Sequence, residues 1–232
     1  MYTLYIANKN YSSWSLRPWV LMRSLSIPFE ERLMTFEEGS NWKRFRAFSP
    51  NGRVPCLHDG NHVVWDSLAI IEYLAERHKG VWPDESEVRA WARCVACEMH
   101  SGFAELRRLC PLNCGLRVEL NGIGQALRAD LARMDEIWSE GLTSFGGPFL
   151  AGEKFSAVDA FFAPVVFRHQ TFGLFSGGPS GNYADFMLRQ PAMQAWYADA
   201  LNEPWRDSSH EAELATIGTV RADHRAPIPA AS

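Results

Sequence analysis

The residues best placed to do chemistry lie near the start of the chain, where two serines follow a short apolar segment. Residues 3–7 (Thr-Leu-Tyr-Ile-Ala) are rich in strand formers, and Ser12 and Ser13 stand where a helix N-cap belongs, ahead of an apolar helical pattern that begins at Leu16. A strand that runs into a helix N-terminus presents free backbone N–H groups and the positive end of the helix dipole. Such a site holds an anion, with a serine hydroxyl aimed at it. The alternative is that these serines only cap the helix.

Composition and charge narrow the class of protein. The 232 residues are 47% hydrophobic and 22% charged, which is normal for a globular protein. A net charge of -4 gives no general attraction to nucleic acid or to an anionic membrane. The sequence also lacks an apolar run of the roughly 18 residues that a bilayer span requires. We therefore expect neither a nucleic-acid partner nor a membrane.

The cysteines and the N-terminus suggest a reducing compartment. The sequence has five cysteines, an odd number, and it enters a strand at once, without the basic and apolar regions of a signal peptide. Free thiols in the cytoplasm are the simplest explanation.

The first 80 residues alternate between strand and helix signals. A second strand is predicted at 29–34, and a hairpin at 54–58 and 62–65 follows the turn Pro50-Asn51-Gly52. Asp66 is then expected to cap an apolar-faced helix that ends near Gly80. This order predicts a small α/β layer.

The strand signals stop after a linker at residues 80–86, and helical patterns take over. They cover 87–109 and 118–142, and a capping box is expected at Ser156–Asp159, a serine followed three residues later by an acid. A last helix is predicted at 191–201, after a glycine-rich flexible loop at 177–181. The predicted organisation is thus an α/β domain (1–79), the linker (80–86), an all-α domain (87–203) and a C-terminal tail (204–232) whose end is loose.

Four pieces of the sequence resemble the cytosolic glutathione transferases, in the order and spacing of that family. Together they extend the resemblance from about Tyr2 to Leu201, and the double serine is most similar to the serine motif of the zeta class, as in a bacterial zeta-like enzyme. The pieces are Ser12-Ser13-Trp14-Ser15-Leu16-Arg17, Ser49-Pro50-Asn51-Gly52-Arg53-Val54-Pro55-Cys56-Leu57, Trp65-Asp66-Ser67-Leu68-Ala69-Ile70-Ile71-Glu72-Tyr73-Leu74, and Gly152 with Phe155-Ser156-Ala157-Val158-Asp159-Ala160. The resemblance implies a thioredoxin-like N-terminal domain followed by an all-α domain.

The resemblance gives the two serines a catalytic role with glutathione as co-substrate. A free thiol has a pKa near 8.5, and hydrogen-bond donors at a helix N-terminus lower it toward the nucleophilic thiolate. The serine hydroxyl would act on the thiol of glutathione rather than on a group of the protein. Matching from the double serine favours Ser12, and counting back from Arg17 favours Ser13. We favour Ser12 narrowly.

The second piece is expected to hold the cysteinyl part of glutathione. By the resemblance, Val54 offers its backbone N–H and C=O in the manner of an added strand, and Pro55 is cis so that Val54 faces the site. From the residues alone, a proline in a strand run marks either an edge position or a cis bond.

The third piece is expected to hold the γ-glutamyl end of glutathione. Asp66 would accept from the α-amine, and the Ser67 hydroxyl with the helix N–H groups would bind the α-carboxylate. Simple capping is the alternative role for both. Lys43 and Arg53 are weaker candidates for the glycyl carboxylate, since either side chain could equally be a solvated base.

The sequence indicates the electrophile site less clearly than the glutathione site. Trp14, Met99, Phe103 and Arg107 are candidates to line it beside the sulfur, which suits a small, largely apolar electrophile. The resemblance also implies a homodimer with the sites near its interface.

We expect no metal site. Cys94 and Cys97 have metal or redox spacing, but they lie one turn apart inside a predicted helix, where core or partly buried thiols are expected, and no second ligand pair follows. His58 and His62 face each other across the predicted hairpin without a carboxylate.

Two departures from the zeta pattern weigh against its isomerase chemistry. Trp14 stands where that class has a cysteine, and the position of its arginine, counted from Asp159, falls at Phe172. A conjugating or dehalogenating transferase is therefore favoured over the alternative, a glutathione-dependent cis-trans isomerase similar to maleylacetoacetate isomerase. A binding protein that keeps the fold without catalysis is a further alternative.

Overall fold

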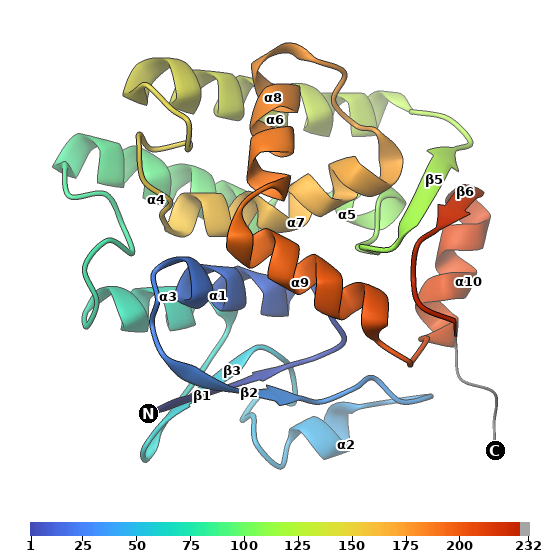
Figure 1. The fold of residues 1–232 in the computed structure, drawn as a ribbon, viewed down its shortest axis with the longest axis horizontal. Coiled ribbons are helices and arrows are strands. Elements are labelled where there is room, and N and C mark those ends of the chain that lie inside the picture. The colour runs from blue at the N-terminus through green and yellow to red at the C-terminus, as the bar shows by residue number, and fades with distance from the viewer. Residues whose placement is uncertain (228–232) are drawn as a thin grey trace.

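The described chain, residues 1–227 of a computed structural model, consists of an α/β half and a mostly helical half that pack against each other (Figure 1). Helix α1 of the first half lies against α7 of the second. The elements of the first half are β1 (Tyr2–Ile6), α1 (Ser13–Ser24), β2 (Phe29–Leu33), α2 (Trp42–Phe45), β3 (Cys56–Asp59), β4 (His62–Trp65) and α3 (Ser67–Ala75). Those of the second half are α4 (Ser86–Ser101), α5 (Ala104–Leu109), β5 (Leu116–Leu120), α6 (Gln125–Phe145), α7 (Ala157–Phe172), α8 (Gly178–Leu188), α9 (Pro191–Asn202), α10 (Ser208–Ile217) and β6 (Gly218–Asp223).

A four-stranded mixed sheet forms the base of the first half. Its strand order is β2-β1-β3-β4, with β1 and β2 parallel and the other neighbours antiparallel. Helices α1 and α3 lie between the sheet and the helical half, and α2 lies toward the opposite side (Figure 1). Alternation along β1 places Leu4 and Ile6 on one face, where both are fully buried. The expected thioredoxin-like α/β layer is confirmed.

Helix α7 is the centre of the second half. Nearly all of its side chains are buried, and it packs on α1, α4 and α8. A helix that is apolar nearly all round must be enclosed in this way. No helix within residues 1–227 combines the length and apolarity needed to cross a bilayer.

The predicted long helix at 87–109 is wrong, because the chain breaks into α4 and α5. Helix α4 ends at Ser101, and Phe103 adopts a left-handed conformation with φ 59° before α5 begins. A side chain at Gly102 would place its Cβ 2.8 Å from the carbonyl oxygen of Glu98, so glycine is required at this tight bend. The apolar pattern continues through the break, which is why periodicity alone missed it.

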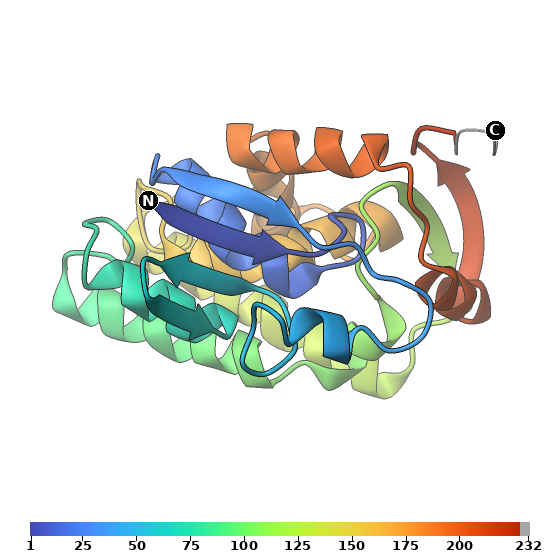
Figure 2. The same cartoon turned by 90° about the horizontal axis from the view of Figure 1, so that it is seen from below.

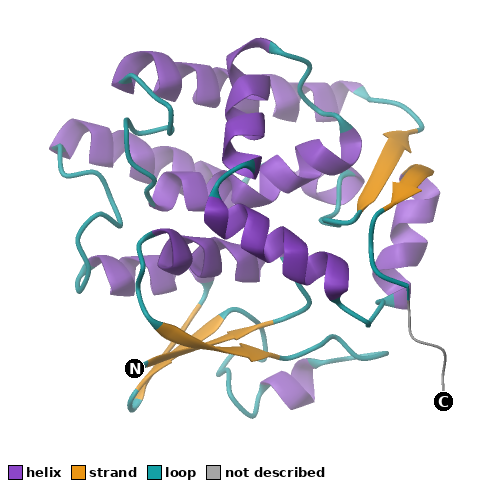
Figure 3. Cartoon of the chain, viewed as in Figure 1, coloured by secondary structure: helices purple, strands orange, loops and turns teal. Residues whose placement is uncertain are grey.

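The second half is mostly helical, as expected, but it also contains two strands that were not predicted. Residues 116–120 form β5 rather than the start of a helix, and β5 pairs antiparallel with β6 near the C-terminal end of the described chain (Figure 3). The pairing partner lies about a hundred residues away, so no local pattern could reveal it. Two smaller expectations fail as well, since α8 begins at Gly178 within the predicted flexible loop and α3 ends at Ala75 instead of near Gly80.

The C-terminal segment, residues 203–227, is fastened to the body of the protein. Arg225 pairs with Glu211 and with Asp223, and the hydroxyl of Tyr11 donates to Glu211 at 2.7 Å. Burial acts to raise the pKa of Glu211, but the hydrogen bonds from Arg225 and Tyr11 outweigh it and hold this pKa below its usual value. Figure 2 shows α10 and β6 side by side with β5 at the end of the molecule. The predicted tail residues 228–232 lie outside the described part.

Asp159 holds the start of α7 in place. Its fully buried carboxylate accepts from the backbone N–H groups of Ser156 and Leu150 and from the hydroxyl of Tyr183, each at 3.0 Å. The bond to Ser156 is the acidic part of the predicted capping box, which is confirmed. The same carboxylate thus ties α8 and the preceding loop to α7.

We expect Asp159→Asn to lower the free energy of unfolding by about 1–3 kcal/mol, because an amide nitrogen cannot accept the hydrogen bond that a carboxylate oxygen accepted. Urea denaturation measures this change. Tyr183→Phe removes only one of the three donors and serves as the comparison. A loss in Asp159→Asn no larger than in Tyr183→Phe would contradict the role given to this carboxylate.

We expect Arg225→Gln to increase amide hydrogen exchange across residues 208–223, because the substitution removes the buried cation between Glu211 and Asp223. The matched control is Arg221→Gln, since Arg221 is exposed on β6 and its pair with Glu119 lies on the surface. Equal exchange in both variants would show that Arg225 does not anchor the segment.

Candidate functional site

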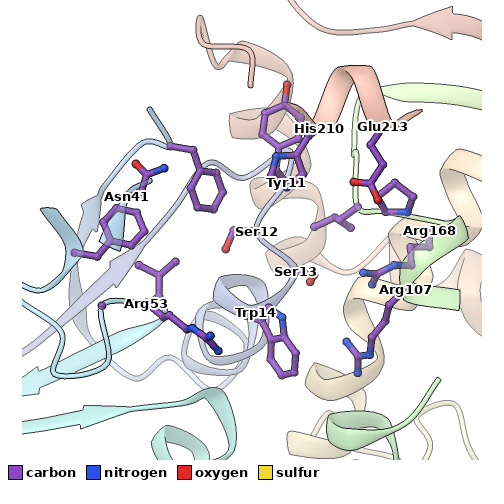
Figure 4. A pocket seen from close by; sticks show the side chains of 16 residues that line it. Tyr11, Ser12, Ser13, Trp14, Asn41, Arg53, Arg107, Arg168, His210 and Glu213 are labelled. Atoms are coloured by element: carbon purple, nitrogen blue, oxygen red, sulfur yellow. The ribbon is translucent and has the colours of Figure 1, made fainter. Parts of the chain in front are cut away.

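The main candidate for a functional site is a cavity of about 450 Å³ at the start of α1, where the two halves meet. Its lining comes from the α1 start, the segments around α2 and before β3, the region of α5, and helices α7 and α10. In Figure 4 Ser12 and Ser13 lie in the middle of the cavity, with Arg53 on one side and two arginines, Arg107 and Arg168, on the other. A cavity between two domains is the usual place for a small-molecule site.

Ser12 and Ser13 occupy the first turn of α1, as the sequence predicted. Ser12 precedes the helix and forms no side-chain capping bond, while Ser13 is the first helical residue. The Ser12 hydroxyl hydrogen-bonds to that of Ser15 at 2.7 Å, and Ser15 in turn accepts from the backbone N–H of Ala7 at 3.2 Å. Both cavity-lining serines are nearly buried, which strengthens any hydrogen bond that they make there.

Val54 lies at the edge of the cavity on the side of the sheet. The Val54–Pro55 peptide bond is cis. Pairing between β1 and β3 begins at Cys56, so the backbone of Val54 is outside the β ladder. Its polar groups are therefore in position to pair with an extended ligand.

A second, smaller cavity of about 190 Å³ adjoins the first and reaches the start of α3. The two cavities share Trp14, Arg53 and Val54. Asp66 and Ser67 line the far end of the smaller one. Together the cavities form one trough from α3 to the helical half.

Asp66 and Ser67 combine helix capping with polar groups at the end of the trough, where Asp66 is partly exposed and Ser67 is buried. The Asp66 carboxylate accepts from the backbone N–H of Leu68 at 2.8 Å, so its predicted capping is confirmed. The residue has φ 74°, an uncommon conformation for a side chain other than glycine and one that is frequent at functional sites. The Ser67 hydroxyl accepts from Arg17 at 3.4 Å.

Arg17 supports this trough from beneath, a role that sequence reasoning did not assign. Its guanidinium is fully buried, lies 4.2 Å from the ring centroid of Trp14, and donates to Ser67 and to Nδ1 of His100. Burial lowers the pKa of Arg17, and the nearby Arg107 and Arg168 act in the same direction. The sequence signal that could have indicated this role is the spacing of Arg17, one helical turn after Ser13.

His100 connects α4 to the trough, and it was also missed. Because Nδ1 accepts from Arg17, we assign the ring proton to Nε2, which lies 3.5 Å from the carboxylate of Asp66. Burial lowers the pKa of His100 although Asp66 acts the other way. A neutral imidazole therefore separates the buried arginine from the aspartate.

The helical half contributes further polar groups that were not predicted. Arg168 on α7 is 3% exposed, and its Nε donates to the carbonyl oxygen of Cys110 at 2.6 Å. Burial lowers the pKa of Arg168 to about 10, with a smaller effect from Arg107. His210 and Glu213 reach the cavity from α10. No local sequence signal predicted that these residues line the cavity. Arg168 lies within an apolar core helix, and α10 lies in a segment that was predicted to be a tail.

The predicted site residues do not all reach the trough. Ser12, Ser13, Trp14, Arg53, Val54, Pro55, Asp66, Ser67 and Arg107 line it. Met99 is fully buried, Phe103 is nearly so, and neither lines the trough. Lys43 is exposed and does not line the trough either.

Cys94 and Cys97 are free thiols exposed on α4, so the expectation that they are core or partly buried is wrong. Residues 1–227 contain no group of three or more His, Cys, Asp and Glu side chains placed to hold a metal ion.

Comparison with known proteins agrees with this architecture. Residues 11–77 match the glutathione S-transferase N-terminal domain. A glutathione S-transferase-like protein, OpS6, of Beauveria bassiana is 27% identical over 180 residues, covering 69% of this chain and 76% of its own. A probable maleylacetoacetate isomerase of Caenorhabditis elegans is 26% identical over 212 residues, covering 87% and 94% of the two chains.

Solved structures show the same fold over most of the chain. A glutathione transferase homolog from Burkholderia with bound glutathione superposes with a TM-score of 0.62 at 22% identity, covering 86% of this chain and 97% of its own. A tau class glutathione S-transferase from mango superposes with a TM-score of 0.65 at 18% identity, covering 93% and 97%. The chain therefore has the glutathione transferase fold, and the first part of it matches the N-terminal domain of that family.

Proposed function

We propose that the protein is a glutathione transferase that activates the thiol of glutathione at the start of α1. The observation that carries this proposal is the trough, which brings Ser12, Val54 and Asp66 onto one continuous surface. These three positions match, in order, the thiol, the cysteinyl backbone and the γ-glutamyl end of an extended glutathione. The bound glutathione of the Burkholderia homolog supports the choice of ligand.

The γ-glutamyl end binds at the start of α3. Ser67 and the backbone N–H groups there receive the α-carboxylate, and Arg17 behind Ser67 adds positive charge. Asp66 receives the α-amine. The glycyl carboxylate extends toward Arg53, which lines both cavities, whereas the exposed Lys43 is a weaker candidate.

Ser12 is proposed to stabilise the thiolate. In this structure the Ser12 hydroxyl donates to Ser15 at 2.7 Å. When glutathione binds, Ser15 donates to the Ser12 oxygen instead, and the Ser12 proton is directed to the sulfur. The positive end of the α1 dipole acts in the same direction. Ser13, one residue on, has no side-chain hydrogen bond among the described residues and is the alternative donor.

The reaction then follows from the thiolate. Its sulfur attacks an electrophilic carbon held in the larger cavity, and a carbon–sulfur bond forms. In a substitution the bond to the leaving group breaks and the leaving group departs with the electron pair. In an addition to a conjugated double bond the neighbouring carbon takes a proton from solvent. The thiol proton has already passed to solvent on binding.

We expect glutathione binding to release a proton near neutral pH in the wild type and not in Ser12→Ala. The donor favours the thiolate, so the bound thiol titrates below its usual pKa near 8.5, and the release is lost when the donor is removed. Calorimetry in buffers of different ionisation enthalpy, at two pH values, measures the released proton.

Ser13→Ala is the matched control for this experiment, because it removes a hydroxyl from the same turn of the same helix. Loss of release in Ser13→Ala alone would move the role to Ser13. Binding without release in the wild type would indicate a binding protein without thiol activation, and no binding at all would contradict the transferase proposal.

A glutathione-dependent cis-trans isomerase is the second candidate. The observation in its favour is that the match to maleylacetoacetate isomerases runs nearly end to end, including the rat enzyme at 24% identity over 92% of this chain. Trp14 and Phe172 remain departures from that pattern. We expect turnover of an aryl halide with glutathione and none of maleylacetoacetate, as measured by spectrophotometric assay. The reverse result would favour the isomerase.

The homodimer stays a prediction from the resemblance, and the cytoplasmic location stays a prediction from the cysteines.

A further inference from the structure

Two arginines on the helical side of the larger cavity are not paired with a carboxylate. Arg107 belongs to α5 and Arg168 to α7, and both line the cavity (Figure 4). Neither forms an ion pair with an acid of the described residues. Buried or half-buried cations are normally paired, so this arrangement calls for a partner that is not part of the chain.

Arg168 is the more enclosed of the two. Its side chain is 3% exposed, and Nε donates to the carbonyl oxygen of Cys110. Nη1 is enclosed in the protein without a hydrogen-bond partner, and Nη2 forms no hydrogen bond with the described residues either. An unsatisfied donor on a buried cation is costly unless a ligand fills it. Because Arg168 lines the cavity, Nη2 is the charged donor that it can offer to a ligand there.

Arg107 lies beside Arg168 and also has an N–H donor without a partner in the described chain. Nε and Nη2 donate to the carbonyl oxygens of Gly102 and Met99, which fix the direction of the side chain. Its guanidinium lies 5.0 Å from the ring centroid of Trp14. Nη1 has no partner in the described chain and remains for a ligand.

The charges around the cavity do not neutralise this pair. Arg53 on the opposite wall adds a third cation. Glu213 is the one carboxylate among the lining residues, and it is exposed on α10 without an ion pair in the described chain. The apolar parts of the wall include Trp14, Phe36, Phe45, Val54, Pro111 and Leu112. A ligand with a flat apolar body and one anionic group matches this distribution.

We propose that Arg107 and Arg168 form an anion subsite that binds the carboxylate of an electrophilic substrate, an aromatic or unsaturated carboxylic acid. This inference rests on the proposed function and adds the substrate class to it. A planar guanidinium can bind a carboxylate through two parallel N–H···O bonds, which would also fix the electrophilic carbon relative to Ser12. The arginines hold the substrate and take no part in bond making.

Glutathione itself carries a second carboxylate, on its glycine, which is the same chemistry from another source. Arg53 lies on the side of the sheet, next to Val54, whereas Arg107 and Arg168 lie on the helical side, across the serines (Figure 4). The position of Arg107 and Arg168 therefore favours the carboxylate of the electrophile, rather than the glycyl carboxylate, as their ligand. The experiment separates the two sources by keeping the glycyl carboxylate constant.

The probes are two S-conjugates, S-(4-carboxybenzyl)glutathione and S-(4-carbamoylbenzyl)glutathione, which differ in the charge of one group and require no turnover. Calorimetry measures their dissociation constants. We expect the wild type to bind the acid at least about tenfold more tightly than the amide, since charge-assisted hydrogen bonds to a carboxylate are lost with the amide.

We expect Arg107→Met and Arg168→Met each to reduce this preference severalfold, while binding of glutathione alone is retained. Arg168→Lys keeps the charge and should retain part of the preference. Arg108→Met is the matched control, because Arg108 is the exposed neighbour on α5 and pairs with Glu105. Thermal unfolding verifies that each variant is folded.

The possible outcomes distinguish failure of the proposed anion subsite from failure of the proposed transferase function. Equal binding of acid and amide by the wild type, with glutathione bound, overturns the subsite and leaves the transferase proposal standing. A preference lost in Arg53→Met and kept in Arg107→Met and Arg168→Met also overturns it. If glutathione and both conjugates fail to bind, the proposed function and the subsite fall together.

Discussion

The packing of α1 between the sheet and α7 is the constraint on which the structure depends. It buries the first turn of α1, so that Ser12 and Ser13 meet the ligand in a cavity rather than in open water. It also buries Arg17, whose charge has no carboxylate within hydrogen-bond distance and is shared between Ser67 and His100. A helix N-terminus with a cation behind it is a poor place for apolar packing and a good place for an anionic tripeptide.

The same geometry explains why the site belongs to both halves of the chain. The sheet side supplies Val54 and Asp66, which suit an extended peptide, and the helical side supplies Arg107 and Arg168, which suit a compact anion. The C-terminal helix α10 adds His210 and borders the cavity. In the proposed function, the sheet side holds glutathione and the helical side selects the electrophile.

The local parts of this site could be predicted from sequence, and the non-local parts could not. A serine at a helix start, a proline in a strand run and Asp66 before an apolar helix each leave a signal within a few residues. Arg168 leaves none, because an arginine in a helix normally reaches solvent, and only the packing of α7 encloses it. The β5–β6 pair joins residues about a hundred positions apart, and the docked C-terminal segment depends on the contact of Tyr11 with Glu211, whose separation is 200 positions. One sequence does not reveal such contacts.

The most direct test of the account is a crystal structure of the protein with glutathione. The account predicts that the sulfur lies at the first turn of α1 within hydrogen-bond distance of the Ser12 hydroxyl, with the γ-glutamyl end at Asp66 and Ser67 and with Arg107 and Arg168 free of the tripeptide. A sulfur that points away from both serines, or a glycyl carboxylate held by Arg107 and Arg168, would contradict it.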